Sequence, residues 1–170
     1  KTGQASCEYS RFVPYGYKFD LPTEAQWEYA CRAGTTTALN SGKNITTKDE
    51  NGYCENVDEV AWYKTSKESA RNTHFVGDPR KKPNAWGLYD MHGNVHEFIK
   101  DVRPSNYPAY TVVDPITVDP LVTVGNQACK RGGSYDAPAY RCRSASRDGF
   151  ALNGKDRATG FRAVLVPVED

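Results

Sequence analysis

Residues 82–98 constrain the fold more than any other stretch, because turn residues, aromatic residues and oxygen-bearing side chains are concentrated there. Pro83 and Asn84 favour a turn, and Gly87 and Gly93 allow backbone angles that other residues rarely adopt. We expect the large apolar side chains between these turns to anchor a core; they are Trp86, Leu88 and Tyr89. The segment therefore predicts loops that are fixed in place by aromatic residues.

The same segment brings hard oxygen ligands close together in the sequence. Asp90, Glu97 and the backbone carbonyls of the turn from Gly93 to Val95 are the ligand type that Ca²⁺ prefers. The alternative is a structural turn whose polar groups satisfy its own backbone. The spacing alone favours this alternative.

We interpret residues 1–170 as a single domain with many loops. The length suits one domain with a real core, while 14 Gly, 10 Pro and an aromatic content of 12% indicate irregular chain held by aromatic anchors. A formal charge of +1 gives no electrostatic footprint for nucleic acid or an anionic membrane. No apolar run approaches the roughly 18 residues of a membrane helix. We therefore expect a soluble monomer. Because the sequence lacks an initiator Met, we expect it to be a mature product or a fragment.

The five cysteines argue against two common kinds of site. Their number is odd and no pair has C-x-x-C spacing, so a zinc ribbon or a thioredoxin-type redox site is not expected. At most two disulfides can form. The cysteines are Cys7, Cys31, Cys54, Cys129 and Cys142.

The clearest predicted helix covers residues 21–34. Thr23 and Gln26 have the spacing of a capping box, and a glycine ends the pattern. Glu24 and Glu28 are expected to face solvent near the positive start of the helix. The positions predicted to face the core recur at helical spacing: Trp27, Ala30, Cys31 and Gly34.

The remaining chain is predicted to be mostly loop. Residues 35–56 are polar and should form a surface excursion that buries little, whereas residues 57–63 should line the core. A strand is predicted for residues 97–102. The four prolines of residues 104–120 predict an extended or looped surface segment, and the tail reads plainly as a strand only at residues 160–166.

Five sequence blocks, in order, resemble the formylglycine-generating enzyme, or sulfatase-modifying factor, domain family. They span residues 21–162. The resemblance implies an α+β, C-type-lectin-like fold with little regular structure, which agrees with the loop-rich reading. By comparison with this family, we expect the N-terminal elements of the full enzyme domain to be short or absent in this sequence, which is then a compact variant or a fragment. The blocks are Leu-Pro-Thr-Glu-Ala-Gln-Trp-Glu-Tyr-Ala, Asn-Ala-Trp-Gly-Leu-Tyr-Asp-Met-His-Gly-Asn-Val, Arg-Gly-Gly-Ser, Cys-Arg-Ser-Ala and Gly-Phe-Arg.

The residues that carry the family's oxidase chemistry are missing here. In the oxidising enzymes, reactive cysteines after the Gly-Gly-Ser motif bind copper, but residues 132–141 hold no cysteine. Asp, Ala or Pro cannot replace a thiolate, so we expect no copper and no enzyme of this type. His92 and His96 are four residues apart, but Gly93 and Asn94 make a helical metal-binding pair doubtful.

The tail is similar to that of the family's non-enzymatic receptors, which a retroelement diversifies. Mutagenesis of adenines, chiefly in Asn codons, cannot yield Lys, Glu, Gln, Met or Trp, and residues 131–154 contain none of these types. The resemblance implies a bacterial ligand-binding protein, outside the cell or on its surface, with a protein or other cell-surface ligand. The alternatives are an oxidase or accessory subunit of the formylglycine-generating type, and an inactive paralogue.

The predicted ligand-binding side chains lie between the blocks of the tail. Tyr140 and Phe150 offer large contact area and Arg141 a fork of donors, as residues at binding hot spots do. The resemblance also implies calcium at Asp90, Gly93, Val95 and Glu97. It further implies a Cys31–Cys142 disulfide, with two buried free thiols as the alternative. The predicted ligand-binding residues are Asp136, Pro138, Tyr140, Arg141, Ser146, Asp148, Phe150 and Leu152.

Overall fold

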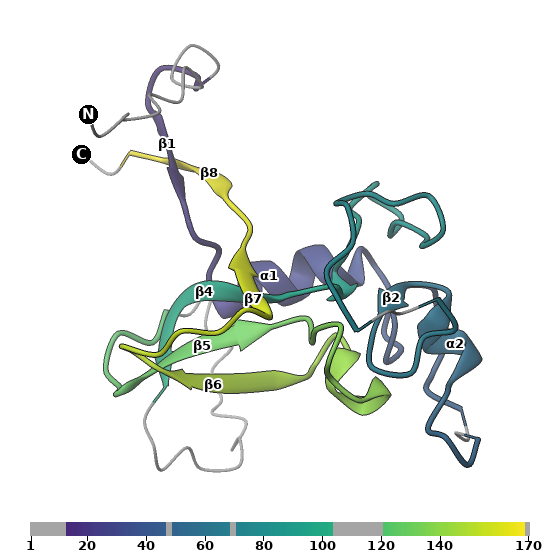
Figure 1. Ribbon diagram of the computed structural model, residues 1–170. Helices are drawn as coiled ribbons and strands as arrows, with labels where there is room; N and C mark the ends of the chain where they lie inside the picture. Colours follow the sequence, from purple (N-terminus) through teal and green to yellow (C-terminus); the bar gives the residue numbers. More distant parts are fainter. Residues whose placement is uncertain (1–12, 47–48, 69–70, 104–120, 169–170) are drawn as a thin grey trace, which may run out of the picture.

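The computed structural model is an α+β arrangement with short elements and long connections (Figure 1). It describes residues 13–46, 49–68, 71–103 and 121–168. No helix in these ranges is long and apolar enough to cross a membrane. The elements are β1 (Tyr17–Asp20), α1 (Glu24–Arg32), α2 (Glu55–Asp58), β2 (Ala61–Trp62), β3 (His92–Gly93), β4 (His96–Arg103), β5 (Gln127–Arg131), the 3₁₀ turn Ala139–Cys142, β6 (Arg147–Ala151), β7 (Thr159–Phe161) and β8 (Val164–Pro167).

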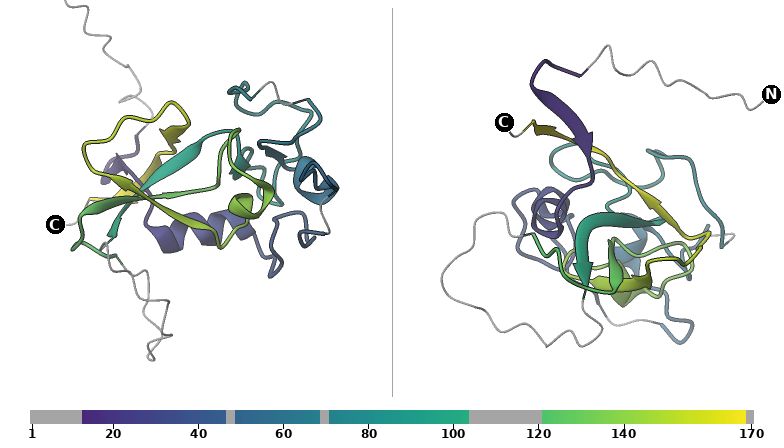
Figure 2. Two further views of the ribbon diagram at one scale, coloured as in Figure 1. Left: turned by 60° about the horizontal axis from the view of Figure 1, so that its bottom comes forward. Right: turned by 90° about the vertical axis from the view of Figure 1, so that its left-hand side faces the viewer.

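A four-stranded sheet with the order β6-β5-β4-β7 forms the centre of the fold. β5 runs antiparallel to both β4 and β6, and β7 runs parallel to β4. Helix α1 covers one side of this sheet (Figures 1 and 2). Two smaller sheets complete the topology: β1 pairs antiparallel with β8, and the two-residue strands β2 and β3 pair in parallel.

The predicted helix and its capping box are confirmed. The Thr23 Oγ1 accepts from the Gln26 N–H at 3.1 Å, and the Gln26 Oε1 accepts from the Thr23 N–H at 3.0 Å. The last helical residue is Arg32, because the next residue, Ala33, already has the left-handed backbone (φ 44°), one residue before the predicted stop. Gly34 follows with φ 93° and is exposed.

The predicted exposure of two helix carboxylates is wrong. Trp27 and Cys31 are buried, as expected, and Ala30 is half-buried. However, Glu24 is only 8% exposed and Glu28 is half-buried. Both carboxylates lie against arginines of the tail, so the helix uses a second face for packing.

The hydrophobic core has two clusters, and the first corrects the reading of residues 35–56. Leu39 and Cys54 from that segment are buried, so it is not a loop that buries little. Residues 57–63 line the core as predicted. The first cluster comprises Leu39, Cys54, Val57, Val60, Ala61, Tyr63, Ala137, Ala139 and Cys142. The second comprises Trp27, Cys31, Met91, Ile99 and Cys129.

Trp86 does not anchor the core as predicted. It is 50% exposed, and its ring meets the ring of Tyr29 edge-on, with 5.0 Å between the centroids. Leu88 and Tyr89 are half-buried. The turn before them is held instead by Asn84, whose Nδ2 donates to the Ala30 carbonyl at 2.6 Å.

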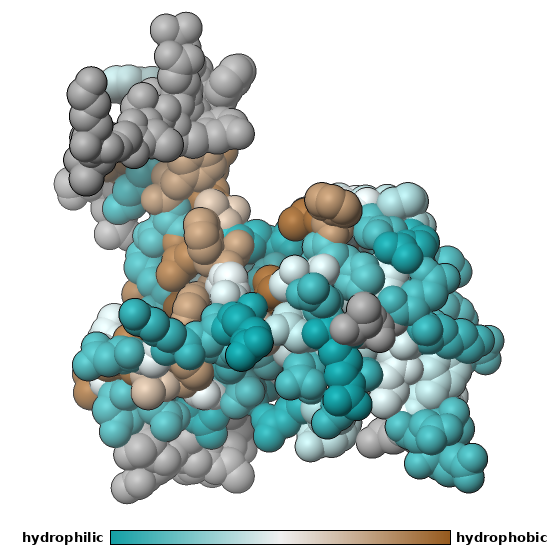
Figure 3. Space-filling view, viewed as in Figure 1, coloured by the Kyte–Doolittle hydropathy of each residue, from teal (hydrophilic) through white to brown (hydrophobic). Residues whose placement is uncertain are grey.

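The tail contains more strand than the sequence predicts. The predicted strands at residues 97–102 and 160–166 correspond to β4 and to β7 with β8, but β5 and β6 were not expected. The proline-rich stretch 104–120 lies outside the described residues. The antiparallel pair of β1 and β8 extends away from the central sheet, and Figure 3 shows hydrophobic surface over this region. Its exposed apolar residues include Tyr17, Phe19 and Leu165.

Candidate ligand-binding site

A polar pocket of about 280 Å³ lies at the end of the sheet where the chain leaves β5. Its floor comes from β4, β5 and β6, and its rim comes from the loop that follows β5 and from the segment before β7. The lining residues are His96, Lys130, Ser134, Asp136, Ala137, Pro138, Arg141, Asp148, Asp156 and Ala158.

Strand register places the pocket on the side of the sheet away from α1. Lys130 of β5 is directly opposite Asp148 of β6, so the two side chains share a face. The neighbouring pair, Arg131 and Arg147, shares the other face and contacts α1. The pocket and the helix therefore use opposite faces of the same strands.

Two glycines direct the loop after β5 over the end of the sheet. Gly132 and Gly133 both have left-handed backbone, with φ of 91° and 79°. A side chain at Gly133 would place its Cβ 2.7 Å from the Cys142 Sγ, which is too close. Only glycine fits there, and this close approach positions the loop that carries Asp136, Pro138 and Arg141.

Charges of both signs line the pocket. Lys130 Nζ lies 3.1 Å from Asp156 Oδ2, and Arg141 Nη1 lies 3.9 Å from Asp148 Oδ1. A hydrogen bond from the Thr159 hydroxyl is the main cause that lowers the pKa of Asp156 to about 2, and Lys130 adds to it. The pocket is thus suited to a polar ligand surface rather than to an apolar small molecule.

His96 is a neutral side chain in the pocket wall, and its buried Nδ1 has no hydrogen-bond partner among the described residues. It is buried, and its Nε2 lies 3.9 Å from Asp148 Oδ2. Burial, helped by the charge of Lys130, lowers the pKa of His96 to about 4. At neutral pH the ring therefore carries no charge.

The structure brings four of the predicted ligand-binding residues together in the pocket: Asp136, Pro138, Arg141 and Asp148. The other four do not line it. Tyr140 is 46% exposed beside the Arg141 guanidinium, and Leu152 is 58% exposed in the turn after β6.

Phe150 and Ser146 have structural contacts instead. The Phe150 ring lies under Lys130 Nζ, 4.9 Å from the centroid, and beside the ring of Phe98. Ser146 is buried, and its carbonyl accepts from Arg131.

Sequence reasoning missed several lining residues, notably His96, Lys130 and Asp156. His96 and Lys130 converge only because β4 pairs with β5. Ser134 belongs to the Gly-Gly-Ser block, and the ligand-binding residues were predicted only between such blocks. The available signal was the alternation along β5, where Lys130 and Arg131 point to opposite faces.

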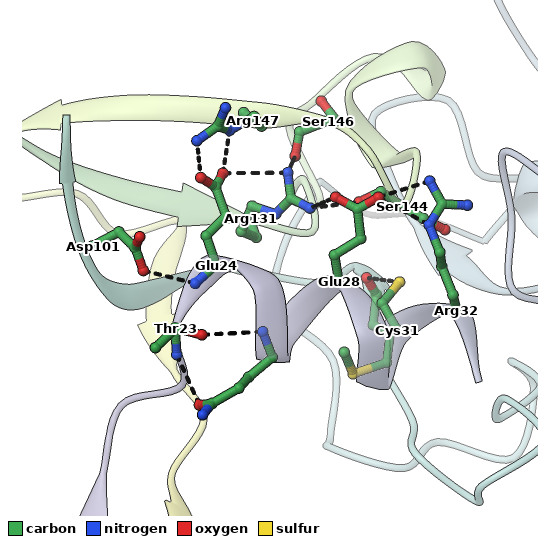
Figure 4. Close-up of polar contacts among 12 residues, drawn as sticks. Thr23, Glu24, Glu28, Cys31, Arg32, Asp101, Arg131, Ser144, Ser146 and Arg147 are labelled. Carbon is green, nitrogen blue, oxygen red and sulfur yellow. Dashed lines mark hydrogen bonds and ion pairs between the residues drawn. The ribbon is translucent and has the colours of Figure 1, made fainter. Parts of the chain in front are cut away.

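Arg131, at the end of β5, connects two later residues of the tail, Ser144 and Ser146, to helix α1 (Figure 4). Its Nη1 donates to the Ser146 carbonyl at 2.9 Å and its Nη2 to the Ser144 carbonyl at 3.0 Å. The same guanidinium pairs with Glu28 and lies 3.4 Å from Glu24. Its side chain is fully buried, so these partners compensate a charge that has left water.

Arg147 makes a second link between α1 and the tail (Figure 4). It pairs with both carboxylate oxygens of Glu24. The backbone N–H of Glu24 in turn donates to Asp101 Oδ2 at 2.7 Å, which ties the start of α1 to β4. The polar groups behind the pocket therefore hold the loop and the sheet on the helix.

Two of the four calcium ligands that the resemblance implies, Glu97 and Asp90, are engaged by protein groups. Glu97 accepts from the Trp27 Nε1 at 2.7 Å and, with both oxygens, from Arg162 at 2.8 and 3.1 Å. Asp90 accepts from the Gly77 N–H at 2.9 Å, and burial raises its pKa. With Arg162 on Glu97, this arrangement does not fit a cation. Calcium at Asp90, Gly93, Val95 and Glu97 remains a prediction. Binding of the ion would require Arg162 to leave the Glu97 carboxylate.

Cys31 and Cys142 are free buried thiols, so the structure holds the alternative to the disulfide. His92 lies between their segments: its Nε2 accepts from the Asn40 N–H at 3.0 Å, and its Nδ1 donates to the Cys142 carbonyl at 2.5 Å. Burial lowers the pKa of His92 to about 4. His92 is thus a neutral structural residue with both ring nitrogens in use.

Comparisons with known proteins agree with this fold. Treponema denticola variable protein 1 superposes with a TM-score of 0.66 at 31% identity, over 88% of this chain and 48% of that chain. PvdO from Pseudomonas aeruginosa superposes with a TM-score of 0.63 at 26% identity, over 90% of this chain and 54% of that one. The loop-rich α+β architecture is that of a C-type-lectin-like domain of the formylglycine-generating enzyme type.

The sequence places the domain in a family. The model of the sulfatase-modifying factor enzyme 1-like domain matches residues 4–166, and the chain belongs to this family. The formylglycine-generating enzyme of Bos taurus is 30% identical over 146 residues, which are 84% of this chain and 37% of that protein. The enzyme of Mycobacterium tuberculosis is 31% identical over 87% of this chain and 51% of its own length. The chain thus spans about a third to a half of these curated relatives.

Proposed function

We propose that this chain is a non-enzymatic, ligand-binding member of its family, and that the polar pocket is its binding site. The observation that carries the proposal is the chemistry of the pocket lining, which offers charged and polar side chains but no thiol. A pocket of this kind can recognise a polar surface. It lacks the nucleophile and the soft metal ligand that oxidation of a substrate cysteine requires.

Three of the four cysteines in the described part of the chain, Cys31, Cys129 and Cys142, do not supply that chemistry elsewhere. Burial raises the pKa of Cys31 and of Cys142 to about 12, and it also raises the pKa of Cys129. Such thiols stay protonated at neutral pH, whereas the thiolate is the reactive form. Cys7 lies outside the described residues.

A diversified tail would suit this architecture. Six of the lining residues fall in the stretch 131–154, which lacks the residue types that adenine mutagenesis cannot produce: Ser134, Asp136, Ala137, Pro138, Arg141 and Asp148. Arg131 holds the backbone of the same stretch through two carbonyls. Side chains in the pocket can therefore change while the frame is kept. The similarity to a Treponema variable protein supports this reading.

We further propose a location outside the cell or on its surface and a protein ligand there. An extract of extracellular and cell-surface proteins is passed over the immobilised chain, and bound proteins are identified by mass spectrometry. Arg141→Ala and Asp148→Ala should each lose the same protein without a change in melting temperature, because both side chains are partly exposed. Lys18→Ala, an exposed change away from the pocket, should retain it. Retention by all variants contradicts binding at the pocket.

The alternative function is that of a formylglycine-generating oxidase, which the names of the curated relatives favour. The test is to incubate the purified chain with a peptide that carries the sulfatase-type cysteine, with and without copper. We expect the peptide mass to stay unchanged. Conversion of the cysteine to formylglycine would overturn the binding proposal.

The retroelement hypothesis has its own test in the genome. Sequencing around the gene should reveal a reverse transcriptase and a near-identical repeat of the segment that encodes residues 131–154. Their absence from the whole genome would contradict a diversified tail while leaving ligand binding untouched.

A further inference from the structure

Phe75 and Val76 form an exposed apolar tip in the connection between β2 and β3. Their exposed fractions are 91% and 83%. Single exposed apolar residues are common on protein surfaces, but two adjacent ones, including an aromatic ring, gain a large contact area when a partner covers them. At this exposure, the two side chains bury little surface within the chain itself.

Buried polar groups fix the backbone on both sides of this tip. Before it, the Asn94 side chain accepts from the His74 N–H and donates to the His74 carbonyl, each at 3.1 Å. After it, Asp90 Oδ2 accepts from the Gly77 N–H at 2.9 Å. The His74 ring also stacks on Trp62, with 3.6 Å between the centroids. A tip held this way loses little conformational entropy on binding.

Asn94 also connects the tip to the rim of the pocket. Its carbonyl accepts from the Tyr135 N–H at 2.8 Å, and Tyr135 lies between the lining residues Ser134 and Asp136. In both views of Figure 2 the connection between β2 and β3 reaches the side of the central sheet away from α1. That is also the side of the pocket. One buried asparagine therefore sets the position of the tip relative to the pocket.

The charges next to the tip indicate the kind of partner. Arg80 pairs with Asp78 at 2.6 Å and with Glu68 at 2.7 Å, and Lys81 pairs with Asp58 at 3.0 Å. Anionic membranes attract clusters of unpaired basic residues, and these cations already have acidic partners. The surroundings of the tip suit a protein surface better.

We propose that Phe75 and Val76 are the apolar part of a ligand-contacting surface whose polar part is the pocket. The partner is a protein that offers an apolar recess beside polar groups. This inference rests on the proposed function. It agrees with the anatomy of protein interfaces, in which aromatic anchors are surrounded by polar contacts.

A phage library of one small folded domain with a randomised face, selected against the whole chain, supplies defined protein probes. The tip variant combines Phe75→Ser with Val76→Ser, and the pocket variant is Asp136→Ala. We expect each variant to weaken most selected probes by tenfold or more. The matched control is Val124→Ser, whose valine is 79% exposed at another place in the chain and should leave binding unchanged. The melting temperature should stay constant for all three variants.

The outcomes separate this inference from the proposed function. Probes that need Asp136 but tolerate the tip variant overturn the inference and leave the pocket as the binding site. Probes that tolerate both variants overturn both proposals. Three results would assign the tip another role and also overturn the inference: binding to anionic phospholipid vesicles that the tip variant abolishes, a dimer that the tip variant dissociates, or a lower melting temperature of the tip variant.

Discussion

At Arg131 a single buried guanidinium contacts both the helix and the tail that carries the pocket. Its donors reach two backbone carbonyls, and Glu28 and Glu24 balance its charge. Lysine offers one ammonium group and cannot match this fork of donors. The neighbouring residue, Lys130, points into the pocket, so the alternation of one strand separates the frame from the binding surface.

Arg131→Ala should destabilise the fold by about 2 to 6 kcal/mol, because it leaves the carbonyls of Ser144 and Ser146 without a donor, at about 1 to 3 kcal/mol each, whereas Glu24 keeps Arg147 and Glu28 keeps Arg32. Arg131→Lys should be destabilising as well. The free energy of unfolding from denaturant titration measures both. Arg143→Ala is the control: this arginine is exposed, and its loss should change stability by less than about 0.5 kcal/mol. Similar small losses for Arg131 and Arg143 would show that the cluster does not hold the tail.

At the scale of elements, the loop after β5 depends on close approach as well as on backbone conformation. Gly133 and Gly42 have nearly the same φ, 79° and 77°. A Cβ at Gly133 would meet Cys142 Sγ at 2.7 Å and the Arg141 carbonyl at 3.1 Å, whereas a Cβ at Gly42 meets nothing within 4 Å. Both glycines thus require left-handed backbone, but only Gly133 lacks room for a Cβ atom.

Gly42→Ala should cost about 1 to 2 kcal/mol, the penalty of left-handed backbone for alanine. Gly133→Ala should cost clearly more, because the loop must also move away from Cys142. Thermal and denaturant unfolding of both variants provide the comparison. Equal losses would mean that the loop adjusts freely, and that its close approach does not position the pocket.

Local sequence signals predicted the elements that depend on local contacts. The capping box of Thr23 and Gln26 joins residues three apart, and the structure confirms it. The exposure of Glu28 and Glu24 was predicted wrongly because their partners, Arg131 and Arg147, lie 103 and 123 residues away in the sequence. No helical periodicity can report such a partner.

The pocket could be predicted only in part, for the same reason. Asp136 and Arg141 were found because they lie between recognisable blocks of the tail. Lys130 and His96 were missed because they reach the pocket through strand pairing. The strand β6 gave no signal, since it contains Asp148 and a glycine and lacks a regular alternation of apolar residues.

At the scale of the whole molecule, stability should depend on pH through two buried histidines. Burial lowers the pKa of both His92 and His96 to about 4, against an ordinary value of 6.5. As the pH falls, the unfolded chain therefore takes up protons before the folded one does. The stability given by these neutral rings is present above pH 6.5 and is lost as the pH falls to about 4.

The free energy of unfolding, measured by denaturant titration from pH 8 to 3, should start to decrease near pH 6.5, well above the ordinary pKa of carboxylates. His96→Gln should make this decrease smaller, because one titrating group is removed and a polar side chain is kept. A curve that is flat between pH 6.5 and 5 would contradict neutral burial of these rings.

Cys142 belongs to the first core cluster and Cys31 to the second, and the last prediction concerns the reactivity of these thiols. With a pKa of about 12, on the order of one in 10⁵ molecules holds a given thiolate at pH 7. Disulfide exchange requires attack by a thiolate, and both sulfurs are buried. The folded, reduced protein should therefore stay reduced in oxidised glutathione, and it should react quickly once denaturant exposes the thiols. Alkylation followed by peptide mapping reads out both states. A Cys31–Cys142 bridge that forms as fast in the folded protein as in the unfolded one would refute this burial argument and favour the disulfide that the family resemblance implies.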